Sequence, residues 1–406
     1  MKKIAIIAEY NPFHYGHKYQ IDKIREEFGK SAVIIALMSG NYTQRGELAF
    51  ADKTLRGRCA ILGGVNLCLE IPFPFSMSSA EFFASSAVHI LNSLGGIDYL
   101  SFGSETGDIE ALEYTARAMM SKKYNEALSK LILEKKATGD GYPKLCEEAL
   151  ISAFGKRELF VPLTPNNILA IEYIKALKRT DSTIIPHTVK RFGSDYKDET
   201  PTSAKIASAS AVRNLIQTNY VEGLKYMPML LGYEIDKMKR LGYLPTDEER
   251  LSSAVITSLR MNTRLAPKSI HDAAGGLFNR LYLKSLEANT IENLVQLTQT
   301  KRYTTARIKR ALWYSTLGVT SSEMSEMPLY TQLLGMDKKG RGELRRIKSQ
   351  TDFPILTKPS RTDTLSPEAK RQKERCDLAD FIYQLAMPTP PSFNIARRFT
   401  PFVLDE

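Results

Sequence analysis

The stretch EYNPFHYGHKYQ, residues 9–20, decides the fold because it joins a buried strand to a helix. It follows the continuous apolar run KIAIIA at 3–8, which is typical of a strand buried on both faces. The segment 17–28 then carries apolar side chains at helical spacing and ends at a glycine. A second apolar run, AVIIALM at 32–38, follows. Together these segments predict one strand–helix–strand unit.

His14 and His17 are two of the chain's five histidines, and both lie where the first strand ends and the first helix begins. Unpaired backbone N–H groups at a helix start bind anions with the help of the helix dipole, and Gly16 leaves room for a phosphate. Two imidazoles there can donate hydrogen bonds and stabilise the charge that grows as pyrophosphate leaves. We therefore expect a phosphate site. A pair that only caps the helix is the alternative, and a metal site is disfavoured because no third ligand lies nearby.

The rest of the first half continues to alternate between strands and helices. Apolar runs predict further strands at 67–71, 99–102 and 183–189. Helical spacing predicts helices over 53–62, 79–94 and 166–177. This pattern is typical of an α/β, Rossmann-like fold, in which helices cover both faces of a parallel sheet and ligands bind at the carboxyl ends of the strands.

The strand signal fades after about residue 215, and helical spacing takes over. It is clearest over 247–261, 285–297 and 366–386. We therefore predict two domains: an α/β nucleotide-binding and catalytic domain at 1–215 and a mostly α-helical domain at 216–406.

Composition narrows the classes of partner and compartment. The formal net charge of +11 favours a polyanionic partner such as nucleic acid, with a solvated basic surface as the alternative. The four cysteines are too scattered for a zinc site or a disulfide framework, which suits a reducing compartment. No apolar run approaches the about 18 residues that a membrane span requires. We therefore expect a cytoplasmic protein with no membrane contact.

The motifs carry a more specific resemblance. HYGH at 14–17 resembles the HxGH signature of the nucleotidyltransferase superfamily that includes class I aminoacyl-tRNA synthetases. Further blocks follow in order, namely MSGNYTQRGELAFADK (38–53), LCLEIPFPFS (67–76), FGSE (102–105), PNNILAIEYIKAL (165–177) and KRYTTARIKRAL (301–312). Over most of its length, the chain resembles the bacterial tRNA(Met) cytidine acetate ligase family.

The resemblance implies a two-step ligase reaction. ATP and acetate would give acetyl-adenylate and pyrophosphate, and the acetyl group would pass to the wobble cytidine of elongator tRNA(Met), forming N4-acetylcytidine. Mg²⁺ is expected with ATP, without an assigned protein ligand. The alternatives are a small-molecule adenylyltransferase of the HxGH superfamily and a non-catalytic RNA-binding protein.

The resemblance also implies which residues bind ATP. His14 and His17 would be catalytic. The surrounding turn and helix start would wrap the nucleotide, namely Ile7, Ala8, Glu9, Tyr10, Asn11, Pro12, Phe13, His14, Tyr15, Gly16, His17, Lys18, Tyr19 and Gln20. Further contacts would come from Gly103, from Asn166 or Asn167, and from Arg191. Gly103 can also be a simple turn residue, one of the asparagines can be only a helix cap, and Lys190 competes with Arg191 as the phosphate-side cation.

A looser block, SASAVR at 208–213, resembles the superfamily's second signature through Ser208, Ser210 and Arg213. Alanines 209 and 211 stand where relatives often have hydroxyl residues. A direct contact with phosphate and a purely structural helix start are both open for this block.

Two groups of polar residues suit the other substrates. One group follows the second strand and would position acetate or the anticodon loop unless it is a solvated loop: Asn41, Gln44, Arg45 and Lys53. The other surrounds Tyr303 and would bind tRNA: Lys301, Arg302, Arg307, Lys309 and Arg310. A second basic run could assist them or form an ordinary solvated face: Lys338, Lys339, Arg341, Arg345, Arg346 and Lys348.

Overall fold

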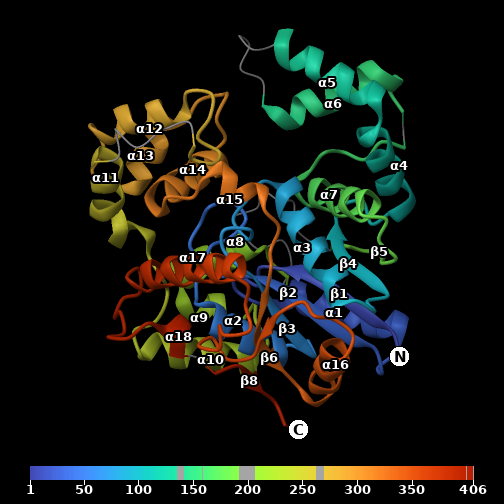
Figure 1. Cartoon of the computed structure of the whole chain (residues 1–406), viewed down its shortest axis with the longest axis vertical. Coiled ribbons are helices and arrows are strands. Elements are labelled where there is room, and N and C mark those ends of the chain that lie inside the picture. The colour runs from blue at the N-terminus through green and yellow to red at the C-terminus, as the bar shows by residue number, and fades with distance from the viewer. Residues whose placement is uncertain (135–140, 158, 192–205, 262–268, 399, 406) are drawn as a thin grey trace.

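Figure 1 shows the computed structural model of the chain, which describes residues 1–134, 141–157, 159–191, 206–261, 269–398 and 400–405. A mixed sheet occupies its centre, with the strands in the order β5-β4-β1-β2-β3-β6-β7 and β8 beside β6. The five parallel strands are β1 (Lys3–Ala8), β2 (Val33–Ser39), β3 (Leu67–Ile71), β4 (Tyr99–Ser104) and β5 (Ile185–Lys190). All five were expected from the sequence, so the α/β class is confirmed.

Helices cover both faces of the sheet because alternate strand residues point to opposite sides. Ile4 and Ile6 pack in one hydrophobic core with α1 (Tyr15–Phe28), α2 (Lys53–Leu62), α8 (Ala209–Thr218) and α10 (Met229–Arg240). Ala5 and Ile7 pack in the other core with α3 (Ala80–Leu94) and α7 (Pro165–Arg179). This double cover leaves the ends of the strands as the accessible part of the sheet.

The part beyond residue 215 is mostly α-helical, as predicted, but it also contains three strands that were not expected from the sequence. They are β6 (Thr331–Met336), β7 (Ile355–Leu356) and β8 (Phe402–Val403). β6 is antiparallel to β3, with Leu67 paired to Met336, and almost all of it is buried. β7 and β8 have only two residues each, too few for a periodic signal, which explains why these two were missed. The division at residue 215 stays a prediction, and β6 to β8 return to the sheet of the first part.

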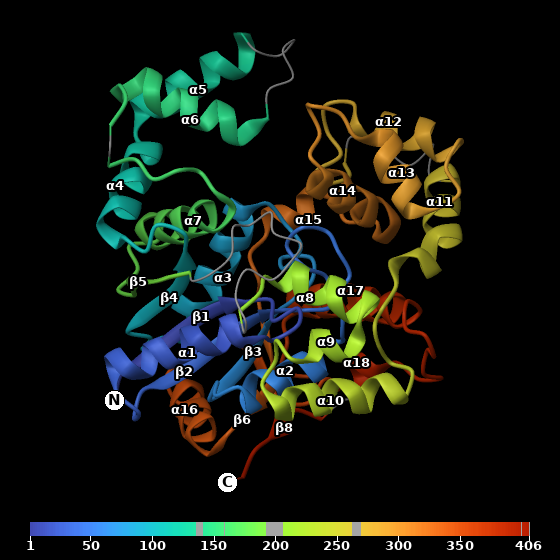
Figure 2. The same ribbon diagram turned by 180° about the vertical axis from the view of Figure 1, so that it is seen from behind.

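Two helical groups stand on the same side of the sheet in Figures 1 and 2. The first follows β4 and contains α4 (Ile109–Met120), α5 (Lys122–Glu134) and α6 (Tyr142–Phe154). The second contains α11 (Ser252–Met261), α12 (Leu277–Ser285), α13 (Ile291–Thr298), α14 (Thr305–Leu317) and α15 (Ser321–Ser325). Tyr42 and Phe73, from the loops after β2 and β3, pack into the core of the second group. This group therefore sits over the carboxyl ends of the parallel strands.

The remaining helices complete the cover. They are α9 (Tyr220–Leu224), the 3-10 helix at Glu248–Leu251, α16 (Lys338–Lys348), α17 (Pro367–Gln384) and α18 (Ile395–Arg398). α16 lies at the opposite edge of the sheet, because its N-cap residue Asp337 accepts a hydrogen bond from Asn66, just before β3. Among the described residues, no helix is long and apolar enough to cross a membrane.

Candidate active site

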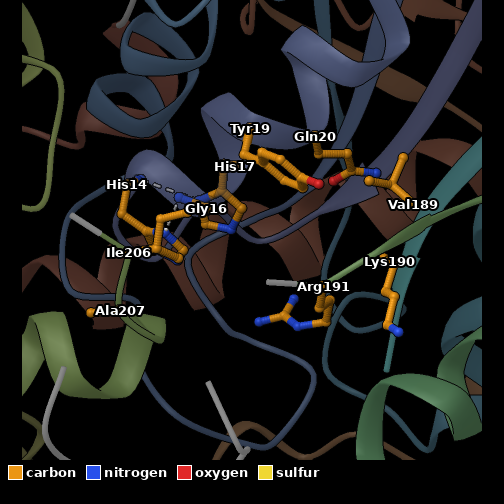
Figure 3. Close-up of a pocket in the computed structure, with 11 residues that line it drawn as sticks. His14, Gly16, His17, Tyr19, Gln20, Val189, Lys190, Arg191, Ile206 and Ala207 are labelled. Atoms are coloured by element: carbon orange, nitrogen blue, oxygen red, sulfur yellow. Dashed lines mark hydrogen bonds between the residues drawn. The ribbon is translucent and has the colours of Figure 1, made fainter. Parts of the chain in front are cut away.

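A cleft lies at the carboxyl ends of β1 and β4 and encloses about 1420 Å³ of space, its open mouth included. It brings together most of the residues predicted to bind ATP: Ile7, Ala8, Glu9, Tyr10, Asn11, His14, His17, Gln20, Gly103, Asn166 and Arg191. A hollow that shares both histidines continues from it and adds Gly16 and Tyr19 (Figure 3). Pro12, Phe13, Tyr15, Lys18 and Asn167 line neither space.

His14 and His17 form a reciprocal pair at the start of α1. His14 is the N-cap residue, and its Nδ1 accepts a hydrogen bond from the Gly16 amide at 3.0 Å. The Nδ1 atom of His17 accepts from the His14 amide at 3.2 Å. The two ring centroids lie 3.9 Å apart. Because each Nδ1 is an acceptor, the single proton of each neutral ring is on Nε2, which leaves Nε2–H as the donor available to a ligand.

Both histidines are held neutral at physiological pH. Burial, followed by the charges of Arg191 and Arg213, lowers the pKa of His14 to about 3. Burial, His14 and Arg191 hold the pKa of His17 well below its ordinary value. Tyr10 packs edge-on against the His17 ring at 4.9 Å between centroids and helps to fix it. The neutral rings can therefore act as hydrogen-bond donors, and their lowered pKa makes them weak general bases.

The structure favours glycine at positions 16 and 103 for a different reason from the one that the sequence suggested. A Cβ on Gly16 would lie 2.7 Å from Cε1 of His14, so the His14 ring itself occupies the space that was expected for phosphate. A Cβ on Gly103 would lie 3.2 Å from Cγ of Arg191, so Gly103 makes room for that side chain. Both glycines serve the site by letting a functional side chain lie flat against the backbone.

Asn166 and Asn167 have separate roles. Asn167 is 1% exposed, and its Oδ1 accepts from the amide of Glu105 at 3.0 Å while its Nδ2 donates to Thr106 and to the Pro162 carbonyl. It is fully occupied in holding the turn after β4. Asn166 instead lines the cleft, and Glu105 accepts from its Nδ2 at 2.6 Å.

Glu105 is a positioning residue to which the sequence analysis gave no role. Besides orienting Asn166, its carboxylate accepts from Thr164 and from the Asn167 amide at 2.8 Å each, and so caps α7. Burial opposes its ionisation, but the hydrogen bonds from Asn166 and Thr164 prevail and lower the pKa of Glu105. Glu105 and Asn167 are 62 positions apart in the chain, so no local sequence signal links this carboxylate to α7.

Arg191 is better placed than Lys190 to act on the histidines. Its amide donates to the Ser104 carbonyl at 2.9 Å, one residue beyond β5. In Figure 3 its guanidinium is turned toward the histidines, and the Lys190 side chain points away. The pKa of both histidines responds to the charge of Arg191 and not to that of Lys190.

The block at 208–213 lines the cleft and also starts a helix. Ser208 is the N-cap of α8 and accepts from the Ala211 amide at 3.1 Å. Arg213 donates to the Asn11 carbonyl at 2.8 Å, and its second Nη is 3.4 Å from the hydroxyl of Ser210. The predicted contact of this block with phosphate stays a prediction, but Arg213 clearly ties α8 to the histidine turn.

Arg56, which was not predicted as a site residue, holds the backbone around the site in place. It is 1% exposed, and its guanidinium donates to the carbonyls of Ala51, Glu9 and Ser39 at 2.8, 2.6 and 3.2 Å. It also donates to the Gly40 carbonyl. Because these carbonyls follow β1 and β2, Arg56 fixes the ends of both strands against each other.

Of the four polar residues expected after β2, Gln44 and Arg45 line the cleft, and Asn41 and Lys53 do not. Lys53 is 2% exposed and pairs with Glu70 at 2.7 Å and with Asp380 of α17 at 2.5 Å. Asn41 donates to the same Asp380 at 2.8 Å. The expectation that Asn41 and Lys53 position acetate or tRNA is wrong, because a buried ion cluster uses both side chains.

Within the described ranges, one group of side chains could in principle hold a metal ion, but the ion cluster makes it unsuitable. Glu70, Cys376 and Asp380 bring their ligand atoms within 4.8 Å of one another. The Lys53 ammonium lies among them, at hydrogen-bond distance from both carboxylates. A cation is therefore already present as a side chain.

The five basic residues predicted to bind tRNA differ in environment. Arg310 is 7% exposed and pairs with Asp272 at 2.6 Å, so it is part of the interior. Lys309 pairs with Glu248 at 2.7 Å. Neither is available for a phosphate without breaking an ion pair.

The other three are more accessible. Arg307 is half-buried and donates to the carbonyls of Asp272 and Ala274 at 3.1 and 3.0 Å. Lys301 and Arg302 are exposed before α14, on the group of helices that stands over the cleft side of the sheet. The second basic run lies on α16, at the opposite edge of the sheet.

The cleft has further walls that motif comparison missed. Thr43 and Glu47 come from the loop after β2, and Phe83, Leu169 and Tyr173 come from α3 and α7. The Gln44 amide donates to Glu9 Oε1 at 2.8 Å, which attaches the loop to the end of β1. In the sequence, Phe83, Leu169 and Tyr173 look like ordinary core positions of a helix. Their place in the cleft lining becomes visible only when α3 and α7 are packed together.

Comparisons with known proteins agree with this geometry. The HIGH Nucleotidyl Transferase family matches residues 1–396. A tRNA(Met) cytidine acetate ligase of Acetivibrio thermocellus is 34% identical, with 100% of both chains covered. A protein of the same name from Caldanaerobacter subterraneus is 36% identical, over 95% of this chain and 96% of the relative. The crystal structure of Thermotoga maritima TmcAL bound with alpha-thio ATP superposes with a TM-score of 0.89 at 28% identity, covering 100% of both chains.

Proposed function

Because this chain belongs to the tRNA(Met) cytidine acetate ligase family of HIGH nucleotidyl transferases, we propose that it activates acetate with ATP and transfers the acetyl group to tRNA(Met). The elongator form of this tRNA is the proposed partner, and the cytoplasm, where tRNA is found, is the proposed compartment. The observation that carries the proposal is the neutral histidine pair, which presents two Nε2–H donors at the start of α1 within the cleft.

The first step joins acetate to AMP. A carboxylate oxygen of acetate attacks the α-phosphorus of ATP, and the bond from that phosphorus to the bridging oxygen of the β-phosphate breaks. The products are acetyl-adenylate and pyrophosphate. Hydrogen bonds from His14 and His17, together with the nearby charge of Arg191, stabilise the negative charge that develops on the phosphate oxygens. Asn166, oriented by Glu105, is the residue of the PNN block that faces the nucleotide.

The second step transfers the acetyl group. The exocyclic amine of the wobble cytidine attacks the acetyl carbonyl carbon, the bond to the AMP oxygen breaks, and AMP leaves as the amine loses a proton to water. A wobble base must leave its stack to reach the cleft. The helical group α11–α14 stands on the side of the sheet where the cleft opens and is the proposed tRNA-binding part.

Mg²⁺ is proposed as a companion of the ATP phosphates. Mg²⁺ usually keeps several waters and binds through substrate phosphates and one or two carboxylates. In the described part of the chain, the cleft offers Glu9 and Glu47 as its acidic residues, and Gln44 and Arg213 already engage them. These residues do not form a dedicated Mg²⁺ site, so no step is assigned to the ion.

We expect the purified protein to catalyse ATP–pyrophosphate exchange that depends on acetate and needs no tRNA. The cleft holds the groups for the first step without any contribution from RNA, so acetyl-adenylate should form reversibly. Exchange of labelled pyrophosphate into ATP measures this, with formate and butyrate as comparison acids. Exchange that requires a phosphorylated small substrate would indicate the small-molecule adenylyltransferase instead, and no exchange under any condition would leave the RNA-binding protein.

We expect the double variant Lys301→Ala, Arg302→Ala to bind tRNA(Met) more weakly and with a smaller salt dependence. Each phosphate contact removed lowers the slope of log affinity against log salt by about one, so the double variant should lose about two. Filter binding over a salt series measures the slope. The matched control is Arg345→Ala, Lys348→Ala, which removes the same charge from exposed positions on α16. Equal losses in both double variants would count against α14 as the binding surface.

A further inference from the structure

One end of the cleft is closed by apolar side chains of α3 and α7. Phe83 is 2% exposed and Tyr173 is 4% exposed, and both also belong to the hydrophobic core on that face of the sheet. The Tyr173 ring packs against Phe102 of β4 at 5.6 Å between centroids. Leu169, half-buried on α7, completes this wall. The rigid core behind these four side chains fixes the depth of the cleft at this end.

The same cleft also contains polar groups. Arg45 and Gln44 line the same cleft, and the Gln44 side chain is anchored by a 2.8 Å hydrogen bond to the Ser78 carbonyl, just before α3. Glu9 lines the same cleft as Tyr173, and burial and then the Glu9 carboxylate raise the pKa of that tyrosine. A cleft that offers both an apolar wall and the Arg45 guanidinium suits a short carboxylic acid, whose charge needs a cation and whose chain needs apolar contacts.

The other end of the cleft suits the nucleoside. It continues into the hollow of Figure 3, which is lined by Val189, Arg191, Ile206 and Ala207. His14 and His17 border both spaces. Phe83, Leu169 and Tyr173 line the cleft but not this hollow. A nucleoside in the hollow, with its phosphate at the histidines, would therefore leave the apolar end free for the acid.

We infer that Phe83, Leu169 and Tyr173 form the acyl pocket and restrict the substrate to the two-carbon acid. This inference rests on the proposed function and adds the basis of its specificity. Longer acids would be rejected by the shape of the pocket. The methyl group of acetate would contact the wall, and a third carbon would have to displace side chains that the core holds in place. One methylene in an apolar pocket typically changes kcat/KM about 10- to 200-fold.

The test measures ATP–pyrophosphate exchange with acetate and with propionate in the full-length protein. Phe83→Leu should raise the ratio of kcat/KM for propionate to that for acetate at least about tenfold. The matched control is Phe82→Leu on the same helix, because Phe82 lies outside the cleft lining and packs against Phe75 and His271, each at 6.4 Å between ring centroids. It should leave the ratio unchanged.

Leu169→Ala enlarges the same pocket from a half-buried position and replaces Phe83→Leu if that variant does not fold. An unchanged ratio in a folded variant that retains acetate-dependent exchange would overturn the acyl-pocket assignment and leave the proposed function intact. Exchange with no dependence on any carboxylate in the unmodified protein would instead remove the proposed function itself. The two failures are therefore distinguishable.

Discussion

Replacing His17 with alanine should lower the rate of acetate-dependent ATP–pyrophosphate exchange by about 100- to 1000-fold. The reason is electrostatic: a donor that is already in place before the transition state contributes this much when it is removed from a buried site. The ring is fixed by the His14 amide at 3.2 Å and by packing against Tyr10, so its Nε2–H is held in place before the reaction. Initial rates of exchange at saturating acetate measure the effect.

His14 needs a variant that keeps its capping role. Asparagine is among the preferred N-cap residues, so His14→Asn should keep the start of α1 and the melting temperature while losing the imidazole donor. We expect exchange to fall by a similar factor. If His14→Asn retained most of the exchange activity, the pair would serve only to cap the helix. The unmodified enzyme should also show no His14 titration between pH 6 and 8, because the pKa of His14 is about 3.

The chemistry of the first strand–helix unit could be predicted because it depends on local sequence. The apolar run before the histidines, the glycine between them and the helical spacing after them all act within about 20 positions along the chain. The same locality placed the five parallel strands and the helices α1, α2, α3 and α7, but α4, α5 and α6 between β4 and β5 were not predicted. It also placed Asn166 and Asn167 at a helix start, but only the hydrogen bonds of Asn167 reveal which of the two is occupied.

The environment of residues with distant partners could not be predicted from the sequence. Lys53 pairs with Asp380, 327 positions away, so its sequence neighbours suggested an exposed loop cation. Arg310 was predicted to bind tRNA because it stands in a basic run, and that run does not show that Arg310 is buried and paired with Asp272. Phe83 resembles any apolar position of an amphipathic helix. Charge and hydropathy alone do not say whether a side chain faces solvent, a partner or a cleft.

Replacing Lys53 with methionine should lower the free energy of unfolding by about 3–5 kcal/mol, because removal of one partner leaves buried charges without compensation. Glu70 and Asp380, at 1% and 4% exposure, would lose the ammonium that lies 2.7 and 2.5 Å from their oxygens. Asp380 belongs to α17, so the loss would loosen that helix from the sheet. Urea unfolding of the variant and the unmodified protein at pH 7 measures the difference.

Two measurements can tell whether the stability is lost because a charge is removed or because packing is removed. A triple variant, Lys53→Met with Glu70→Gln and Asp380→Asn, removes every charge of the ion cluster and should recover most of the stability. The loss in Lys53→Met should also shrink as the pH falls from 7 to 5. Burial already raises the pKa of Glu70, and without Lys53 it rises further, so the folded state takes up protons that the unfolded state does not. A loss that is independent of pH and persists in the triple variant would show that the aliphatic stem of Lys53, and not its charge, holds α17 in place.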